Sequence, residues 1–325
     1  MIKNLRIAAA FAAAIASAPA PALSAAAFPD HPIRLVVGYA AGGPSDALAR
    51  ALSEPLSAAL GQPVVVDNHP GASGIAGADA VVKAAPDGYT IGIGTAGNLA
   101  IRPAVQAGIP YDARRDLQPI SLLATVPNVL LVSPSIPVTT VGQLVEYARA
   151  RPGALSYAST GPGNSSHLTA ELFKTLTGVE LVHLPYRGAE PALNDLMSGQ
   201  VQIMFATMRS SIQHVRSNAV RALAVTGRVR SAWKPDLPTM GEAGVIGCEF
   251  TAWFGVFGPK GMPAPIIERL HGAVAKAMDT PEMKAHLIQL GAEPVASTAA
   301  EFALRLDVEI AKWGKVAKAA GIAVH

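Results

Sequence analysis

Short apolar runs alternate along the chain with stretches in which apolar residues recur at helical spacing. The runs at 33–37, 64–66 and 89–94 predict buried strands, and the segments at 48–60 and 75–83 predict helices between them. A regular alternation of strand and helix favours an α/β fold with a mostly parallel sheet and helices on both faces.

The pattern changes in the middle of the chain. Apolar runs at 120–123 and 129–132 flank Pro127-Asn128, so we expect one long extended crossover into a second domain. Further strands are predicted at 155–159, 181–184, 201–205 and 220–225, with helices between them, and the last strand is expected to return to the first domain. The sequence therefore predicts two α/β lobes that enclose a cleft.

Each predicted lobe contains a glycine-rich turn from a strand into a helix. The first turn is Gly38-Tyr39-Ala40-Ala41-Gly42-Gly43-Pro44-Ser45-Asp46, and the second is Thr160-Gly161-Pro162-Gly163-Asn164-Ser165-Ser166-His167. The N–H groups at a helix start have no partner within the helix and lie at its positive dipole end. We therefore expect the two turns to face each other across the cleft and to bind an anion. The alternative for either turn is a capped helix start without a ligand.

Composition and charge point to an exported protein. Half of the 325 residues are hydrophobic and only 15% are charged. Lys3 and Arg6 precede an alanine-rich apolar stretch and small residues near 24–27, which together predict a secretory signal peptide over 1–26. The mature chain then has 24 basic and 23 acidic residues, a net charge of +1, and no basic block, so nucleic acid is not expected as a partner.

The usual enzymatic motifs are missing from the sequence. It has no Gly-x-Ser-x-Gly elbow, no phosphate loop, no dinucleotide fingerprint and no histidine pair at metal-ligand spacing, so we expect no cofactor and no metal. The single cysteine, Cys248, lies in an apolar region and is interpreted as a buried hydrophobic residue. Ser165 and His167 leave one enzymatic alternative open, a hydrolase acting in the cleft.

Taken together, the motifs of the mature chain resemble those of the Bug-type, or tripartite tricarboxylate transporter, periplasmic substrate-binding proteins. The resemblance covers nearly the whole mature chain. Its motifs are Phe28-Pro29, Pro32-Ile33-Arg34-Leu35-Val36-Val37, Ala41-Gly42-Gly43 with Asp46, Val66-Asp67-Asn68, Pro70-Gly71-Ala72, Pro86-Asp87-Gly88-Tyr89-Thr90, Tyr111-Asp112, Arg115-Asp116-Leu117, Pro119-Ile120, Tyr157-Ala158-Ser159, Gly161, Gly163, His167-Leu168, Pro185-Tyr186-Arg187-Gly188 and Ala222-Leu223-Ala224-Val225-Thr226.

The resemblance implies a two-domain periplasmic binding protein of type II, the Venus-flytrap architecture, joined by crossover hinge strands. We assign 27–124 and 245–325 to domain I and 125–244 to domain II, with the ligand cleft between them. In the family, the two turns hold a ligand carboxylate. The expected ligand-binding residues are Tyr39, Ala41, Gly42, Gly43, Ser45, Asp46, Thr95, Gly97, Gly161, Gly163, Asn164, Ser165, His167, Ala206 and Arg209.

Two positions depart from the family's usual pattern. Asn164 stands where members usually have Ser or Thr, and Ala206 stands where many have an Asp. Without that carboxylate, a ligand with an amino group is disfavoured. Arg209, three residues further on, is a candidate to pair a second carboxylate, with a plain exposed arginine as the alternative. Tyr39, Met208 and Trp253 can line the pocket and would suit an aromatic acid, with packing in the core as the alternative for Trp253.

The function expected from these residues is a monomeric periplasmic receptor for a small organic carboxylate, mono- or dicarboxylate, aliphatic or aromatic. The resemblance implies delivery to a tripartite tricarboxylate-type carrier with two integral membrane subunits. Two alternatives remain open: a ligand-sensing co-receptor for a sensor kinase, and the hydrolase that uses Ser165 and His167.

Overall fold

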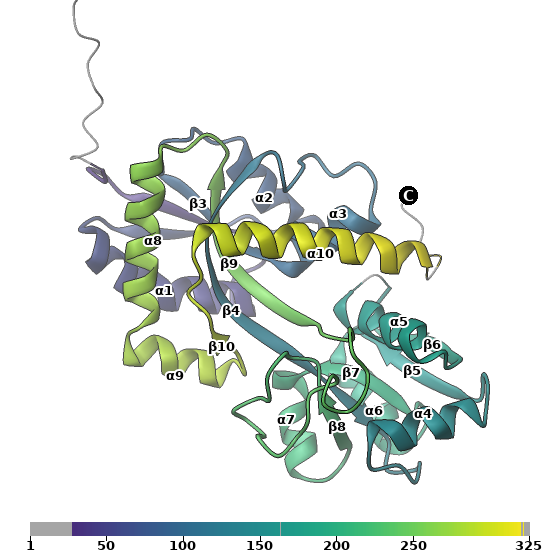
Figure 1. Cartoon of the computed structure of the whole chain (residues 1–325). Helices are drawn as coiled ribbons and strands as arrows, with labels where there is room; N and C mark the ends of the chain where they lie inside the picture. Colours follow the sequence, from purple (N-terminus) through teal and green to yellow (C-terminus); the bar gives the residue numbers. More distant parts are fainter. Residues whose placement is uncertain (1–27, 163, 320, 322–325) are drawn as a thin grey trace, which may run out of the picture.

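The protein folds into two lobes joined by long strands. The computed structural model describes residues 28–162, 164–319 and 321. The expected signal peptide and Gly163 lie outside these residues. Figure 1 shows the two groups of helices, with β4 and β9 running diagonally between them. In this part of the chain, no helix has both the length and the apolar character needed to span a membrane.

The first lobe is built around three parallel strands. β1 (Ile33–Val37) lies between β2 (Val64–Asn68) and β3 (Thr90–Thr95), and pairs in parallel with both. β9 (Thr251–Pro259) then pairs antiparallel with β3 and with β4 (Leu117–Val132), and the short β10 (Glu293–Pro294) pairs antiparallel with β4. The strands β1 and β3 are largely buried, as the apolar runs predicted.

Helices cover both faces of this sheet. One face packs against α1 (Pro44–Leu60), α8 (Ala264–Met278) and α9 (Pro281–Gln289), with Leu48, Leu52 and Leu56 of α1 fully buried. The other face packs against α2 (Ile75–Val82), the π-helical turn η3 (Gly97–Ile101), α3 (Arg102–Val105) and α10 (Ala299–Ala319). A one-turn helix, η2 (Ala72–Gly74), precedes α2.

The second lobe repeats the plan of the first. β5 (Leu155–Ser159) pairs in parallel with β6 (Leu181–Pro185) and with β7 (Ile203–Thr207), while β7 and β8 (Arg221–Val225) pair antiparallel with β4. The helices are α4 (Val141–Arg149), α5 (Ser165–Thr177), α6 (Ala189–Ser198) and α7 (Met208–Arg216). Separate apolar clusters fill the two faces of this sheet.

β4 belongs to both lobes. Its first part, 117–127, pairs with β9, and its last part, 128–132, pairs with β7 and β8. At the change of partners, the main-chain N–H of Asn128 donates to the Thr226 hydroxyl at 2.8 Å, and that hydroxyl donates to the carbonyl of Phe250. Thr226 and Asn128 are fully buried. This hydrogen-bond cluster joins the outgoing and returning strands where the lobes meet.

The predicted fold class is confirmed: each lobe carries three parallel strands, and antiparallel connecting strands join the lobes. The single crossover predicted from the runs at 120–123 and 129–132 is β4. One expectation was wrong. The strand at 220–225 does not return to the first lobe, because β8 pairs with the second-lobe part of β4, and the chain returns through β9 instead. The residue boundaries assigned to the two domains stay a prediction.

Replacing Thr226 by Val tests how much this hydrogen-bond cluster contributes to stability. Valine keeps the shape of threonine but leaves the buried N–H of Asn128 without its acceptor, which costs about 1–3 kcal/mol of unfolding free energy. Urea unfolding followed by circular dichroism measures the loss. The matched control is Thr175→Val on the exposed face of α5, where we expect a change within about 0.5 kcal/mol. Equal unfolding free energies of the two variants would show that the hydrogen-bond cluster at Thr226 does not contribute to stability.

Candidate functional site

A cavity of about 300 Å³ lies between the lobes. The first lobe contributes the ends of β1 and β3 and the start of α3, the second lobe contributes the start of α5, and β9 forms the floor. Arg102 is the one charged side chain among the described lining residues. The lining residues are Tyr39, Ser73, Thr95, Ala96, Gly97, Ile101, Arg102, Asn164, Ser165, Phe250, Ala252, Trp253 and Phe254.

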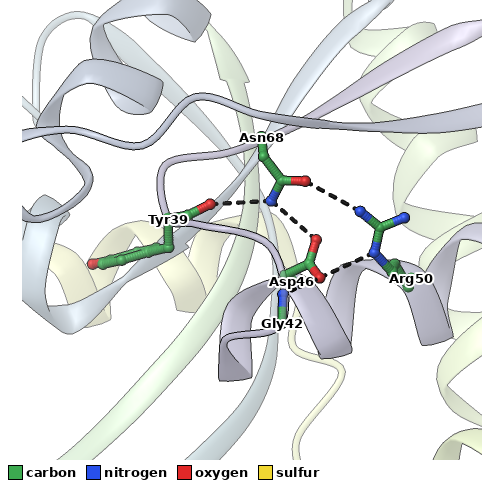
Figure 2. A network of polar contacts seen from close by, with 5 residues as sticks. All are labelled: Tyr39, Gly42, Asp46, Arg50 and Asn68. Atoms are coloured by element: carbon green, nitrogen blue, oxygen red, sulfur yellow. Dashed lines mark hydrogen bonds and ion pairs between the residues drawn. The ribbon is translucent and has the colours of Figure 1, made fainter.

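The first glycine-rich turn is held by Asp46. Its buried carboxylate accepts the N–H of Gly42 at 2.8 Å, the amide of Asn68 at 2.9 Å and the guanidinium of Arg50 at 3.0 Å (Figure 2). The amide of Asn68 also donates to the carbonyl of Tyr39. These bonds lower the pKa of Asp46 to about 2, with the Arg50 contact as the largest cause.

This network ties the Asp46 side chain to the backbone of the turn. The helix begins after Gly43, and no side chain caps it. Asp46 instead accepts the N–H of Gly42, four residues earlier. The carboxylate therefore fixes the shape of the turn from behind. The turn residues Ala41, Gly42, Gly43, Ser45 and Asp46 lie outside the cavity lining, whereas Tyr39 lines it.

A third turn, between β3 and η3, places Tyr39 and Thr95 together. The Tyr39 hydroxyl lies 2.8 Å from the Thr95 hydroxyl, and Asn98 accepts hydrogen bonds from both the N–H and the hydroxyl of Thr95. Burial raises the pKa of Tyr39, so its phenol is neutral. A Cβ on Gly97 would lie 3.3 Å from the Thr95 hydroxyl and 3.6 Å from that of Tyr39. The absence of a side chain at Gly97 therefore keeps this part of the cavity open.

The second glycine-rich turn is closed by its own polar side chains. Asn164 caps α5: its Oδ1 accepts the N–H of His167 at 3.1 Å, and its amide donates to the Thr160 hydroxyl at 2.6 Å. The Ser166 hydroxyl accepts the N–H of Thr160, and that of Ser159 accepts the N–H of Gly161. The cap leaves two N–H groups of the first helical turn without a partner among the described residues.

Those two N–H groups belong to Ser165 and Ser166. The first intrahelical bond of α5 is made by Leu168, whose N–H donates to the carbonyl of Asn164 at 3.0 Å. The first turn of a helix has no other internal acceptors. Because Asn164 and Ser165 line the cavity, the positive dipole end of α5 lies at its wall.

Three aromatic rings stack beneath this turn. The ring of His167 lies 4.0 Å from that of His183, which in turn stacks on Tyr157. Burial lowers the pKa of His167 to about 4 and also lowers the pKa of His183, so both rings are neutral near pH 7. His167 is a buried packing residue on α5, outside the cavity lining.

Sequence reasoning missed Arg102 and Ser73. The Arg102 guanidinium donates to the Ser73 hydroxyl at 3.2 Å and reaches the Gln106 amide oxygen at 3.5 Å. Ser73 adopts a φ of 58°, a conformation that is costly for a residue other than glycine. Arg102 follows an apolar stretch and precedes Pro103, so neither spacing nor a motif distinguishes it from an ordinary surface arginine.

Two of the expected ligand-binding residues are not part of the lining of this cavity. Ala206 is buried in the apolar core of the second lobe. Arg209 is exposed on the first turn of α7, beside Gly291 of the first lobe, and does not line the cavity. Cys248 is buried, as expected, and burial raises the pKa of its thiol to about 12. Gly161 shapes the second turn but does not line the cavity.

A larger cavity of about 520 Å³ lies beside α10 and the loop that leads into β9. Its lining carries charges of both signs, because three cations lie there together with three carboxylates: Arg228, Arg305 and Lys312 with Glu249, Glu301 and Glu309. The smaller cavity has Arg102 and no acidic residue among its described lining, so it is the better candidate for an anionic ligand. No group of three or more potential metal ligands is present among the described residues.

Comparison with known proteins identifies the family. Residues 48–322 match the model of the tripartite tricarboxylate transporter family receptor. The chain belongs to this receptor family. It is 40% identical to a UPF0065 protein of Pseudomonas sp. strain P51, over 97% of this chain and 94% of that protein. It is 35% identical to protein BugT of Bordetella pertussis, over 92% of each chain. Members of the family are periplasmic receptors and not enzymes.

Solved structures of similar proteins share the fold of this receptor. An R. palustris protein solved with adipate is 40% identical, with a TM-score of 0.74, over 92% of this chain and all of that one. MatC of Rhodopseudomonas palustris, with bound malate, is 32% identical with a TM-score of 0.70, over 89% and 99% of the two chains. A ligand-free TctC protein from Polaromonas is 26% identical with a TM-score of 0.82, over 90% and 99%.

Acid titration tests the role assigned to Asp46. Because the folded-state pKa is lowered from 3.8 to about 2, the carboxylate contributes about 2 kcal/mol that is complete above pH 5 and is lost as the pH falls toward 2. Unfolding free energies of wild type and Asp46→Asn, measured from pH 2 to 7, should therefore converge at low pH. Glu54→Gln, an exposed change on the same helix, should leave the profile unchanged. Parallel curves for wild type and Asp46→Asn would contradict the assignment.

Proposed function

We propose that this receptor closes its two lobes around one small organic carboxylate in the periplasm and delivers it to a membrane carrier. The observation that carries the proposal is the interlobe cavity, in which Arg102 is the one charged side chain among the described lining residues. The adipate and malate complexes of the two R. palustris proteins support the same class of ligand.

The electrostatics of the cavity favour an anion. Arg102 supplies a positive charge, and the start of α5 supplies two N–H groups at its positive dipole end. None of the described lining residues is acidic, so an ammonium group would find no counter-charge there. Hydrogen bonds to a charged group contribute about 1.5–3 kcal/mol each, and a few of them are enough for the roughly 8 kcal/mol of a micromolar complex.

Closure of the lobes is the proposed binding motion. The two lobes meet along β4 and β9, and the cavity lining comes from both lobes. The similar structures are consistent with such a motion. The ligand-free Polaromonas structure has the higher TM-score although its sequence is less similar than those of the two ligand-bound proteins. A different angle between the lobes in the bound proteins would produce this order.

The remaining parts of the proposal concern assembly, export and the membrane partner. We propose that the receptor acts as a monomer, is exported by its N-terminal segment and works with two integral membrane subunits. A co-receptor for a sensor kinase would use the same ligand site. The hydrolase alternative has little support, because neutral, buried His167 packs on other rings instead of lining the cavity beside Ser165.

Calorimetry and NMR together test the function. The purified mature receptor should bind at least one small mono- or dicarboxylate with micromolar or tighter affinity and be stabilised thermally by it. Proton NMR should show the same molecule unchanged after prolonged incubation. Turnover of the ligand, or the lack of any carboxylate ligand in a panel of aliphatic and aromatic acids, would contradict the proposal.

Ser165→Pro tests the main-chain contact of α5. Proline removes the N–H but suits the first helical position, and Asn164 before it has an extended conformation (φ −90°, ψ 178°) that proline tolerates. The reference is Ser165→Ala, which removes the hydroxyl and keeps the N–H. We expect the proline variant to bind the best ligand about tenfold more weakly than the alanine variant, by calorimetry. Equal affinities would remove this N–H from the site.

A further inference from the structure

We propose that Arg102, oriented by Ser73, forms a subsite for a second carboxylate and makes the receptor selective for dicarboxylates over monocarboxylates. The inference rests on the proposed function, since it concerns the far end of a ligand whose near carboxylate binds the start of α5. Arg102 replaces Arg209 in the role that the sequence suggested.

The position of Arg102 separates it from the α5 amides. Arg102 begins α3 in the first lobe, whereas Ser165 and Ser166 begin α5 in the second. Both Arg102 and Ser165 line the same cavity. A ligand that bridges the lobes therefore meets a cation at one side and main-chain N–H groups at the other.

The floor between these two ends is apolar. Ala252, Trp253 and Phe254 of β9, with Phe250 just before it, line the cavity without presenting a charge. A surface of this kind suits a chain of methylene groups or a ring between two carboxylates. The indole N–H of Trp253 is buried and has no acceptor among the described residues, so a ligand oxygen is one group that would satisfy it.

The guanidinium of Arg102 has N–H donors that make no hydrogen bond within the described chain. It carries five N–H groups, and within the described chain it makes one hydrogen bond to Ser73 at 3.2 Å and one long contact to Gln106 at 3.5 Å. No carboxylate in the described chain lies within ion-pair distance of it. These contacts orient the plane of the guanidinium and leave further N–H groups for a carboxylate, which Arg binds through two parallel hydrogen bonds.

Closure makes a second anion necessary. When the lobes close, Arg102 loses water, and a desolvated cation is costly unless it is paired. A ligand with one carboxylate can satisfy either α5 or Arg102, whereas a ligand with two can satisfy both. Arg209 faces no such constraint, because it stays exposed on α7 outside the cavity.

The experiment compares dicarboxylates with their monomethyl esters. Straight-chain acids of four to eight carbons are titrated by calorimetry against wild type, Arg102→Gln and Arg102→Lys, each checked for folding by thermal melting. The ester keeps the length of the acid and removes one charge. Arg151→Gln, on the exposed surface of the second lobe, is the matched control for the loss of one positive charge.

Wild type should bind its best diacid at least tenfold more tightly than the monoester. Arg102→Gln should weaken diacid binding by at least tenfold and change monoester binding by less than twofold, so that the preference disappears. Arg102→Lys keeps the charge but cannot make two parallel hydrogen bonds to a carboxylate. Its affinity for the diacid should therefore lie between those of wild type and Arg102→Gln. Arg151→Gln should bind like wild type.

Three results would overturn the inference, and they differ from failure of the proposed function. Wild type could bind diacid and monoester equally, Arg102→Gln could weaken both ligands equally, or Arg209→Gln could abolish the preference while Arg102→Gln does not. In each of these cases a carboxylate still binds, so the proposed function stands. If wild type binds no acid at all, the proposed function fails and the subsite fails with it.

Discussion

The first turn of a helix leaves main-chain N–H groups without partners, and this constraint organises the site of the receptor. In the second lobe, Asn164, Ser166 and Ser159 satisfy the N–H groups of the turn one after another, until those of Ser165 and Ser166 remain. In the first lobe, Asp46 takes the N–H of Gly42 and is itself held by Arg50 and Asn68. Most polar side chains near the turns therefore hold the backbone and leave binding to a few groups.

A long strand shared by the lobes gives these groups their relative position. β4 passes from one lobe to the other and changes partners at Asn128, where Thr226 ties the outgoing strand to the segment that leads back. The cavity lies beside this connection, since Phe250 contacts Thr226 and also lines the cavity. The proposed closure would therefore need only a small rotation at this point to change the width of the cleft.

Much of the fold could be predicted from the sequence, and the reasons are physical. Buried parallel strands appear as short apolar runs, and β1, β3, β5 and β7 stood out for that reason. The crossover was visible as two apolar runs in series. The return path was misassigned because β8 carries the same apolar signal whichever lobe it joins. Only the hydrogen-bond register decides that it stays in the second lobe.

The site was harder to predict than the fold. Glycine-rich turns are recognisable because few other residues fit them, so the start of α5 could be found from the sequence. Asp46 could be noticed, but whether its carboxylate faces a ligand or the backbone depends on Arg50 and Asn68, which come from elsewhere in the chain. Arg102 carries no local signal at all. Its proposed role rests on the absence of any other charge among the described residues that line the cavity with it.

A crystal structure of the receptor with its tightest dicarboxylate is the decisive test of the proposed ligand site. We expect closed lobes, one carboxylate about 3 Å from the N–H groups of Ser165 and Ser166, and the other on the guanidinium of Arg102. A dicarboxylate bound in the cavity beside α10, or one held in the cleft without contact to the start of α5, would contradict it.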